Sequence, residues 1–221
     1  MNYLDYKKVN LYMFSLAQPN YESDYNVFIS KLIEMDISGQ TKQLNVKSDS
    51  LKLVYICIKD NNLQIEFLPS SNNFYNFINA LDVKAKDEII KKGPEWFGNS
   101  LNSDTVNNIY KQSVQLPVKL PGFPTVNFKI GENCKIVGAR RKKLIFDSLK
   151  PNMEIELSFT IEGVYFNKNK CNLVYCVNCI KVINGMCQTL ENLFSDNDEQ
   201  HKNDNKNDID SETNDITMSI C

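Results

Sequence analysis

Residues 153–161, MEIELSFTI, alternate without error between apolar and polar side chains, and no other stretch constrains the fold as strongly. A period of two is typical of a β-strand with one buried face. Gly163 follows, where a glycine predicts a bulge or a sharp bend. The turn residues 167–170 then lead into CNLVYCVNCIKVI, which reads as the return strand. The stretch therefore predicts a long β-hairpin.

Similar patterns occur earlier in the chain. LKLVYICI and LQIEFL flank the turn residues 59–62 and predict a second hairpin. Residues 8–16 predict a further strand, whereas residues 26–35 fit a strand or a helix. Residues 74–92 predict two shorter elements, the second helical. Residues 103–114 predict a helix with Ser103 as the N-cap.

These elements predict a mainly β protein with one or two short helices, the last of them near residues 186–194. An OB-like, partly open β-barrel with Greek-key connections fits best, and a sandwich is the alternative. The chain has 221 residues, so we expect one β-rich domain over residues 1–194. Residues 195–221 are acidic and poor in apolar side chains, which predicts a disordered tail.

Several classes of protein are disfavoured. No apolar run reaches the roughly 18–20 residues of a membrane span, and the N-terminus lacks the features of a signal peptide. We therefore expect an intracellular protein without a membrane partner. The only histidine, His201, lies in the predicted tail, so a histidine-based catalytic triad is not expected. No phosphate-binding glycine loop is present, and we expect no enzyme and no cofactor.

The pair Cys176 and Cys179 suggests a zinc site, but residues i and i+3 of a regular strand point to opposite faces. We therefore expect no metal and interpret the seven cysteines as free thiols. A nuclease with two metal ions stays open, because its carboxylates need no sequence motif.

Charge is distributed unevenly along the chain. Residues 191–221 carry a net charge of −7, whereas residues 1–190 carry +5. Between Lys111 and Lys150 there are nine basic and two acidic residues, including the run RRKK at 140–143. This run is either a solvated loop or a track for phosphates. The tail is either a solubilising segment or a segment that occupies a basic groove and recruits partners.

Single-stranded DNA binding requires cations for the phosphates and flat rings on which bases stack. Trp96 and Phe97 lie between Gly93 and Gly98, which predicts an irregular loop. Each candidate ring could instead belong to the core. The candidate residues are Trp96, Phe97, Phe123, Tyr165 and Phe166 for the bases and Lys119, Lys129, Arg140, Arg141, Lys142 and Lys143 for the phosphates.

The order GPEWFG, IYKQS, KLPGFPTVNFKI and LKPNMEIELSFTIEGVYFNKNKCNLVYCVNCIKV resembles the single-stranded DNA-binding proteins of nucleocytoplasmic large DNA viruses. The similar portion covers residues 93–182. The resemblance implies an OB-fold core within residues 93–194 and sequence-nonspecific binding of single-stranded DNA. It also implies DNA contacts for Trp96, Phe97, Tyr165 and Phe166. Residues 1–92 either complete the barrel, form a separate small β domain or carry a self-association surface.

The resulting prediction is a non-enzymatic protein that coats unwound DNA during viral replication, recombination or repair. Binding of RNA and self-association stay open, and the acidic tail is predicted to contact replication proteins. If the chain is viral, it would act in the host nucleus or at a cytoplasmic replication site. One alternative is a protein-interaction or virion structural module that uses the same basic and aromatic surface. The other is a metal-dependent nucleic-acid enzyme.

Overall fold

The structure is a computed structural model, and it describes residues 3–23, 26–35, 41–118, 121–138 and 142–184. These residues belong to one compact unit, Met1–Met186. The predicted helix at 186–194 and the predicted tail at 195–221 lie outside the described residues. None of the described helices is long and apolar enough to cross a lipid bilayer.

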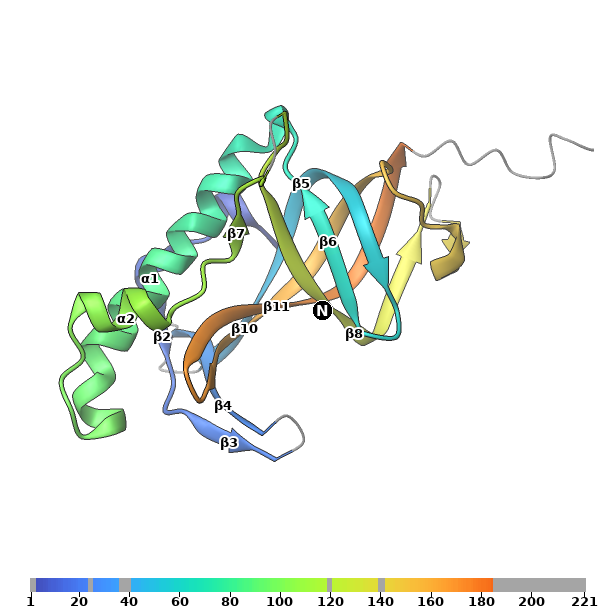
Figure 1. Cartoon of the computed structure of the whole chain (residues 1–221). Helices are drawn as coiled ribbons and strands as arrows, with labels where there is room; N and C mark the ends of the chain where they lie inside the picture. The colour runs from blue at the N-terminus through green and yellow to red at the C-terminus, as the bar shows by residue number, and fades with distance from the viewer. Residues whose placement is uncertain (1–2, 24–25, 36–40, 119–120, 139–141, 185–221) are drawn as a thin grey trace, which may run out of the picture. The chain divides into compact units, whose positions relative to one another are not determined.

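Five strands form a closed barrel (Figure 1): β5 (Thr41–Cys57), β6 (Asn62–Glu66), β8 (Thr125–Val137), β11 (Lys170–Asn184) and β10 (Glu154–Asn167). They pair in this order, and β10 also pairs with β5 and so closes the ring. The pair β8–β11 is parallel, and the other four pairs are antiparallel. Numbered along the chain, the strands follow the order 1-2-3-5-4 of an OB-fold barrel. The predicted mainly β, OB-like architecture is confirmed.

Both predicted hairpins are present, as β5–β6 and β10–β11. Strands β5 and β6 precede residue 93, so the N-terminal part of the chain completes the barrel, which was one of its three alternatives. The ambiguous stretch at 26–35 is the strand β4, Val27–Met35. The remaining strands are short: β1 (Leu4–Asp5), β2 (Phe14–Leu16), β3 (Asn20–Glu22), β7 (Val114–Gln115) and β9 (Lys143–Leu144).

Most of the strand predicted at residues 8–16 is absent. The 3-10 turns η1 (Tyr6–Lys8) and η2 (Leu11–Met13) occupy this region, and only Phe14–Leu16 forms a paired strand. The side chain of Asp5 accepts a hydrogen bond from the backbone N–H of Lys7, and Asn10 does the same for Tyr12. Such local bonds compete with strand pairing.

Helix α1, Asn72–Phe97, is one continuous element of 26 residues where shorter elements were predicted. Its buried side chains recur every three or four residues from Phe74 to Ile89, and this stripe packs on the barrel. Gly93 lies against Leu101, where a Cβ would come within 3.1 Å of its side chain. Tertiary packing thus overrides the local preference of Gly93 and Pro94 for a turn.

The prediction of an irregular loop around Trp96 and Phe97 is therefore wrong. Both residues lie in the last turn of α1, and Gly98 ends the helix with a φ of 69°. Helix α2, Ser103–Ile109, is shorter than predicted, and its N-cap is Asn102 rather than Ser103. The Asn102 side chain accepts from the Thr105 N–H at 2.7 Å.

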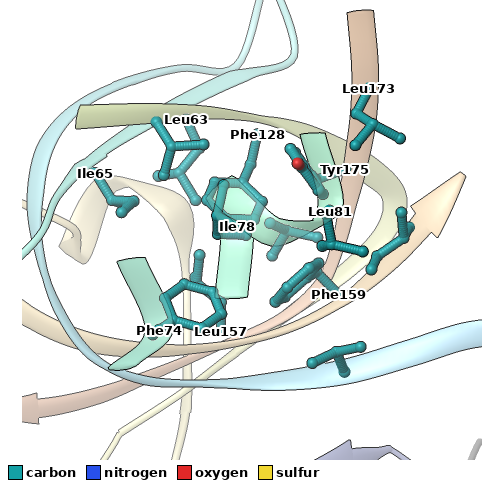
Figure 2. Packing of buried hydrophobic residues seen from close by; sticks show 14 of the residues in the cluster. Leu63, Ile65, Phe74, Ile78, Leu81, Phe128, Leu157, Phe159, Leu173 and Tyr175 are labelled. Carbon is teal, nitrogen blue, oxygen red and sulfur yellow. The ribbon is translucent and has the colours of Figure 1, made fainter. Parts of the chain in front are cut away.

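The core fills the barrel and continues onto α1. Figure 2 shows Phe128, Phe159 and Tyr175 of the barrel strands gathered near Ile78 and Leu81 of the helix. The ring of Phe159 contacts that of Phe128 at 5.1 Å and that of Phe74 of α1 at 6.0 Å. Barrel and helix therefore share a single hydrophobic core.

Gly163 marks the point at which β10 changes its partner. Up to Ile161 the strand pairs with β5, and from Gly163 onward it pairs with β4. The φ of Gly163 is 139°, and a Cβ there would lie 2.1 Å from the carbonyl oxygen of Ser30. Only glycine fits this position, and the predicted bulge is confirmed. Beyond it, residues 163–174, β3 and the start of β4 form an extension that we call the arm.

Candidate nucleic-acid interface

An open groove of about 680 Å³ runs along the outer face of the barrel, over the parallel pair β8–β11. It exists because the register between the two strands shifts partway along the pair. Val177 pairs with Ile130, and Cys179 then pairs with Lys135. Residues 131–134 thus stand opposite a single residue, Asn178, and bulge outward. We call this depression the outer groove, and it is lined by Tyr3, Asn61, Lys129, Ile130, Gly131, Glu132, Asn133, Lys135, Glu162, Cys176, Asn178 and Cys179.

A lysine and a tyrosine meet at one end of the outer groove. The Nζ atom of Lys129 lies 5.9 Å from the ring centroid of Tyr165, within the range of a cation–π contact. The Tyr165 hydroxyl donates to Oε2 of Glu162 at 2.6 Å. This hydrogen bond fixes the tilt of the ring and occupies one carboxylate oxygen of the groove. The other groove-lining cation, Lys135, lies past the bulge.

Polar side chains continue from the groove across the outer face. The Thr160 hydroxyl donates to Oδ1 of Asn45 at 2.6 Å and accepts from Nδ2 of Asn178 at 2.8 Å. Burial raises the pKa of Tyr3, and a hydrogen bond with Asn178 acts in the opposite direction. These bonds hold Asn178 on the groove floor.

Cys176 and Cys179 both line the outer groove, so the expectation that they face opposite sides is wrong. The irregular pairing at Asn178 shifts the alternation of inward and outward side chains along β11 by one residue. Burial raises the pKa of Cys176 to about 11 and that of Cys134 to about 12, which keeps both as neutral thiols. Within the described residues, no three or more His, Cys, Asp or Glu side chains are arranged to hold a metal ion.

The structure does not bring all the predicted site residues together. Of the predicted site residues that the structure describes, only Lys129 and Tyr165 lie at the outer groove. Successive residues of a strand point to opposite faces, and Phe166 accordingly packs on Trp96 and Phe97 at the end of α1, on the other side of the hairpin. The ring centroids of these three residues are 5.8–6.3 Å apart.

Phe123 lies just before β8 and lines a separate hollow of about 280 Å³ with Phe67 and Tyr75. Lys143 pairs with Val137 at the end of β8, next to the exposed Lys142, and so lies beyond the Lys135 end of the groove. The predicted contacts Lys119, Arg140 and Arg141 fall outside the described residues.

Tyr55 is an exposed ring that the sequence did not indicate. It continues the inward series Leu51 and Leu53, so alternation places it in the core. The pairing of β5 with β6 slips between Leu53 and Tyr55, and this bulge turns the ring outward, where it is 48% exposed. Tyr55 pairs with Gln64 of β6, the strand that also pairs with β8 beside Lys129.

Comparison with solved structures finds similar folds in phage proteins. The bacteriophage T7 single-stranded DNA-binding protein gp2.5 aligns over 71% of this chain and 97% of its own, at 11% identity and a TM-score of 0.47. A C-terminally truncated single-stranded DNA-binding protein of bacteriophage Enc34 aligns over 80% and 98%, at 9% identity and a TM-score of 0.46. The Enc34 protein in complex with ssDNA aligns over 76% and 96%, at 9% identity and a TM-score of 0.44. No protein-family model and no curated protein sequence matches the chain.

Proposed function

We propose that this protein binds single-stranded DNA without sequence preference along the outer groove. OB-fold barrels bind oligonucleotides on the outer face of their second and third strands, near the loops that join strands 1–2 and 4–5. In this chain these strands are β6 and β8, and the loops are residues 58–61 and 168–169. Asn61 of the first loop lines the groove, and Tyr165 lies near the second. The observation that carries the proposal is the contact of Lys129 of β8 with the half-buried ring of Tyr165, beside a groove that adjoins the third barrel strand and the first of these loops.

The groove offers both components of single-strand binding. Lys129 and Lys135 supply cations for the phosphates, and Tyr165 supplies a ring on which a base can stack. Tyr55 adds a second ring on the neighbouring strands. Stacking on a ring contributes about 1–3 kcal/mol per base and tolerates any base. Lys142 and Lys143 would extend the cationic path past the Lys135 end. Lys119, Arg140 and Arg141 stay predicted phosphate contacts.

The biological role belongs to the same proposal. A protein that covers unwound DNA acts in viral replication, recombination or repair, as a binding protein and not as an enzyme. Residues 1–194 would form the binding domain, and the acidic tail at 195–221 would contact replication proteins. We retain the interaction module as the rival function, since an exposed aromatic and basic surface can also bind an acidic protein.

The test is fluorescence anisotropy of a labelled oligo-dT of about 30 nucleotides, with duplex DNA as competitor, in a chelator. We expect duplex-resistant binding that Tyr165→Leu weakens about tenfold, since loss of one stacked base costs on the order of 1–3 kcal/mol. Lys129→Ala should also weaken binding. Lys86→Ala, on α1 and away from the groove, is the matched lysine control.

Two results would refute the proposal. The wild-type chain could bind no oligonucleotide, or it could bind while the groove variants keep full affinity. In the first case, capture of an acidic protein at the same surface would support the rival function.

A further inference from the structure

Three adjacent strands of the arm each carry an aromatic ring at the same level. Tyr21 of β3 pairs with Phe28 of β4, and Phe28 pairs with Phe166 of β10. Directly paired residues on neighbouring strands project to the same face. The ring centroids of Tyr21 and Phe28 are 5.2 Å apart. The three residues therefore form a ladder across the sheet.

The end of α1 lengthens this ladder. Phe97 and Trp96 contact the ring of Phe166 at 5.8 and 6.3 Å. We call the resulting set of five rings the aromatic row, and it consists of Tyr21, Phe28, Phe166, Phe97 and Trp96. Tyr21, Phe28 and Phe97 are 55%, 51% and 43% exposed, respectively. A contiguous exposed apolar patch of this kind is typical of a binding surface.

The charges around the row favour a polyanion as the ligand. Lys168 and Lys170 lie at the hairpin turn next to Phe166, and the backbone N–H of Lys111 donates to Cys171 O, opposite Phe166. Among the described residues these three lysines form no ion pair with a carboxylate.

The row also continues the outer groove in space. Tyr165 and Phe166 are neighbours on β10 that face opposite sides of the same hairpin. A DNA strand that leaves the groove over Tyr165 and rounds the turn at Lys168 reaches Phe166 next. Phe28 and Tyr21 follow on one side, and Phe97 and Trp96 on the other.

We propose that the aromatic row is a second binding segment, on which unpaired bases of the same DNA strand stack after they leave the outer groove. This inference rests on the proposed function and adds a length threshold to it. A short oligonucleotide fills the groove alone, whereas a longer one engages both segments and gains affinity by effective concentration.

Trp96 is the only tryptophan in the chain, so its fluorescence reports directly on the row. The experiment titrates the full chain with oligo-dT of about 8 and about 30 nucleotides, lengths that bracket the footprint of a single OB barrel. We expect the long oligonucleotide to quench Trp96 and the short one to leave its emission unchanged. The double substitution Tyr21→Ala and Phe28→Ala should weaken binding of the long oligonucleotide about tenfold or more and leave binding of the short one unchanged.

Control variants distinguish the removal of aromatic rings from unfolding of the protein. Phe28→Tyr keeps a ring and should retain affinity, whereas Phe28→Leu keeps apolar bulk and should not. Tyr12→Ala removes a ring that is 94% exposed but lies outside the row, and it should have no effect. Thermal melting should be unchanged in all of them, because the replaced side chains are half-exposed or more.

The outcomes distinguish this inference from the proposed function. If no oligonucleotide binds the wild-type chain, the proposed function fails and the row fails with it. If both lengths bind and the row variants lose nothing, the second segment alone is refuted. If the row variants weaken both lengths equally, the length threshold is refuted. If they alter the oligomeric state in sedimentation with DNA affinity intact, the row is a protein interface and the inference is overturned.

Discussion

At the scale of single residues, Asp82 joins parts of the chain that are distant in sequence. Its Oδ1 atom accepts from the Tyr110 hydroxyl and the Ser113 hydroxyl at 2.7 Å each, and Oδ2 accepts from the Ser113 N–H at 2.8 Å. The Ser113 hydroxyl also lies 2.8 Å from the hydroxyl of Tyr175 in the barrel. One carboxylate thus connects α1, the segment after α2 and β11.

We expect Asp82→Ala to lower the free energy of unfolding by about 1–3 kcal/mol, because buried donors lose their acceptor. Burial is the largest cause of the shift and raises the pKa of Asp82 above its usual value. The hydrogen bonds to its carboxylate act in the opposite direction. The folded state therefore binds the proton more tightly than the unfolded state. The contribution of Asp82 to stability is complete below its unfolded-state pKa and falls as the pH rises through its folded-state pKa. The stability difference between wild type and Asp82→Ala should be larger at pH 4 than at pH 7, in urea titrations. A difference that grows with pH would contradict this assignment.

Some site residues could be found from the sequence and others could not. The sequence pointed to Tyr165 and Lys129, which the structure places in contact at the groove, and their role in binding stays a prediction. Tyr55 was hidden because a bulge reverses its face, and bulges depend on how two strands pair. Tyr21 and Phe28 gave no signal, because their place in the aromatic row comes from strand register, which joins residues far apart in the chain.

At the scale of elements, two features decide where the arm lies. Strand β10 changes its partner from β5 to β4 at Gly163. Helix α1 continues through Gly93 and Pro94 and so places Trp96 against Phe166. The two hairpins were predictable, because alternation and turn residues are local signals. The continuity of α1 was not predictable. It depends on the packing of the buried stripe of the helix against the barrel, which outweighs the local turn propensity.

We expect Gly163→Ala to destabilise the protein by more than the roughly 1–3 kcal/mol of a strained backbone conformation, because its Cβ would also clash with Ser30 O. Hydrogen exchange should show faster exchange of the amides of β4 at residues 28–31 than in wild type. The barrel segment at residues 155–161 should stay protected.

Gly98→Ala is the matched control for this prediction. Gly98 also has a positive φ, of 69°, but nothing lies within 4 Å of the position that its Cβ would take. The control should therefore cost only about 1–2 kcal/mol, from the left-handed backbone alone. If Gly163→Ala costs no more than Gly98→Ala, the close approach of β4 is not what requires glycine.

At the scale of the whole molecule, the net charge of −2 conceals a positive body and a negative tail. The described groove contains as many lysines as glutamates, so its own electrostatic attraction for DNA is modest. The proposed DNA binding would therefore draw on cations beyond the groove, and Lys142 and Lys143 lie at the Lys135 end.

We expect replacement of residues 140–143 by alanine to flatten the dependence of log K on log salt for oligo-dT. Each phosphate that the variant no longer neutralises should reduce the slope by about 0.7, because fewer counterions are released. Anisotropy titrations at several salt concentrations measure this slope. The double substitution Lys86→Glu and Lys91→Glu, on α1, lowers the net charge by the same four units and controls for that change. An unchanged slope in the 140–143 variant would exclude this run as a binding site for phosphates.

Gly163, where β10 changes its partner strand, divides a barrel of fixed size from an arm of adjustable length. A closed ring of five strands cannot gain or lose a strand without opening, whereas the antiparallel strands of the arm, β3, β4, β10 and β11, can lengthen by pairs of residues and keep their register. Lengthening or trimming the arm beyond Gly163 would change the length of the surface that is proposed to bind DNA and leave the barrel as it is. Under the proposed function, the span of DNA occupied by one molecule can thus evolve separately from the stability of the fold.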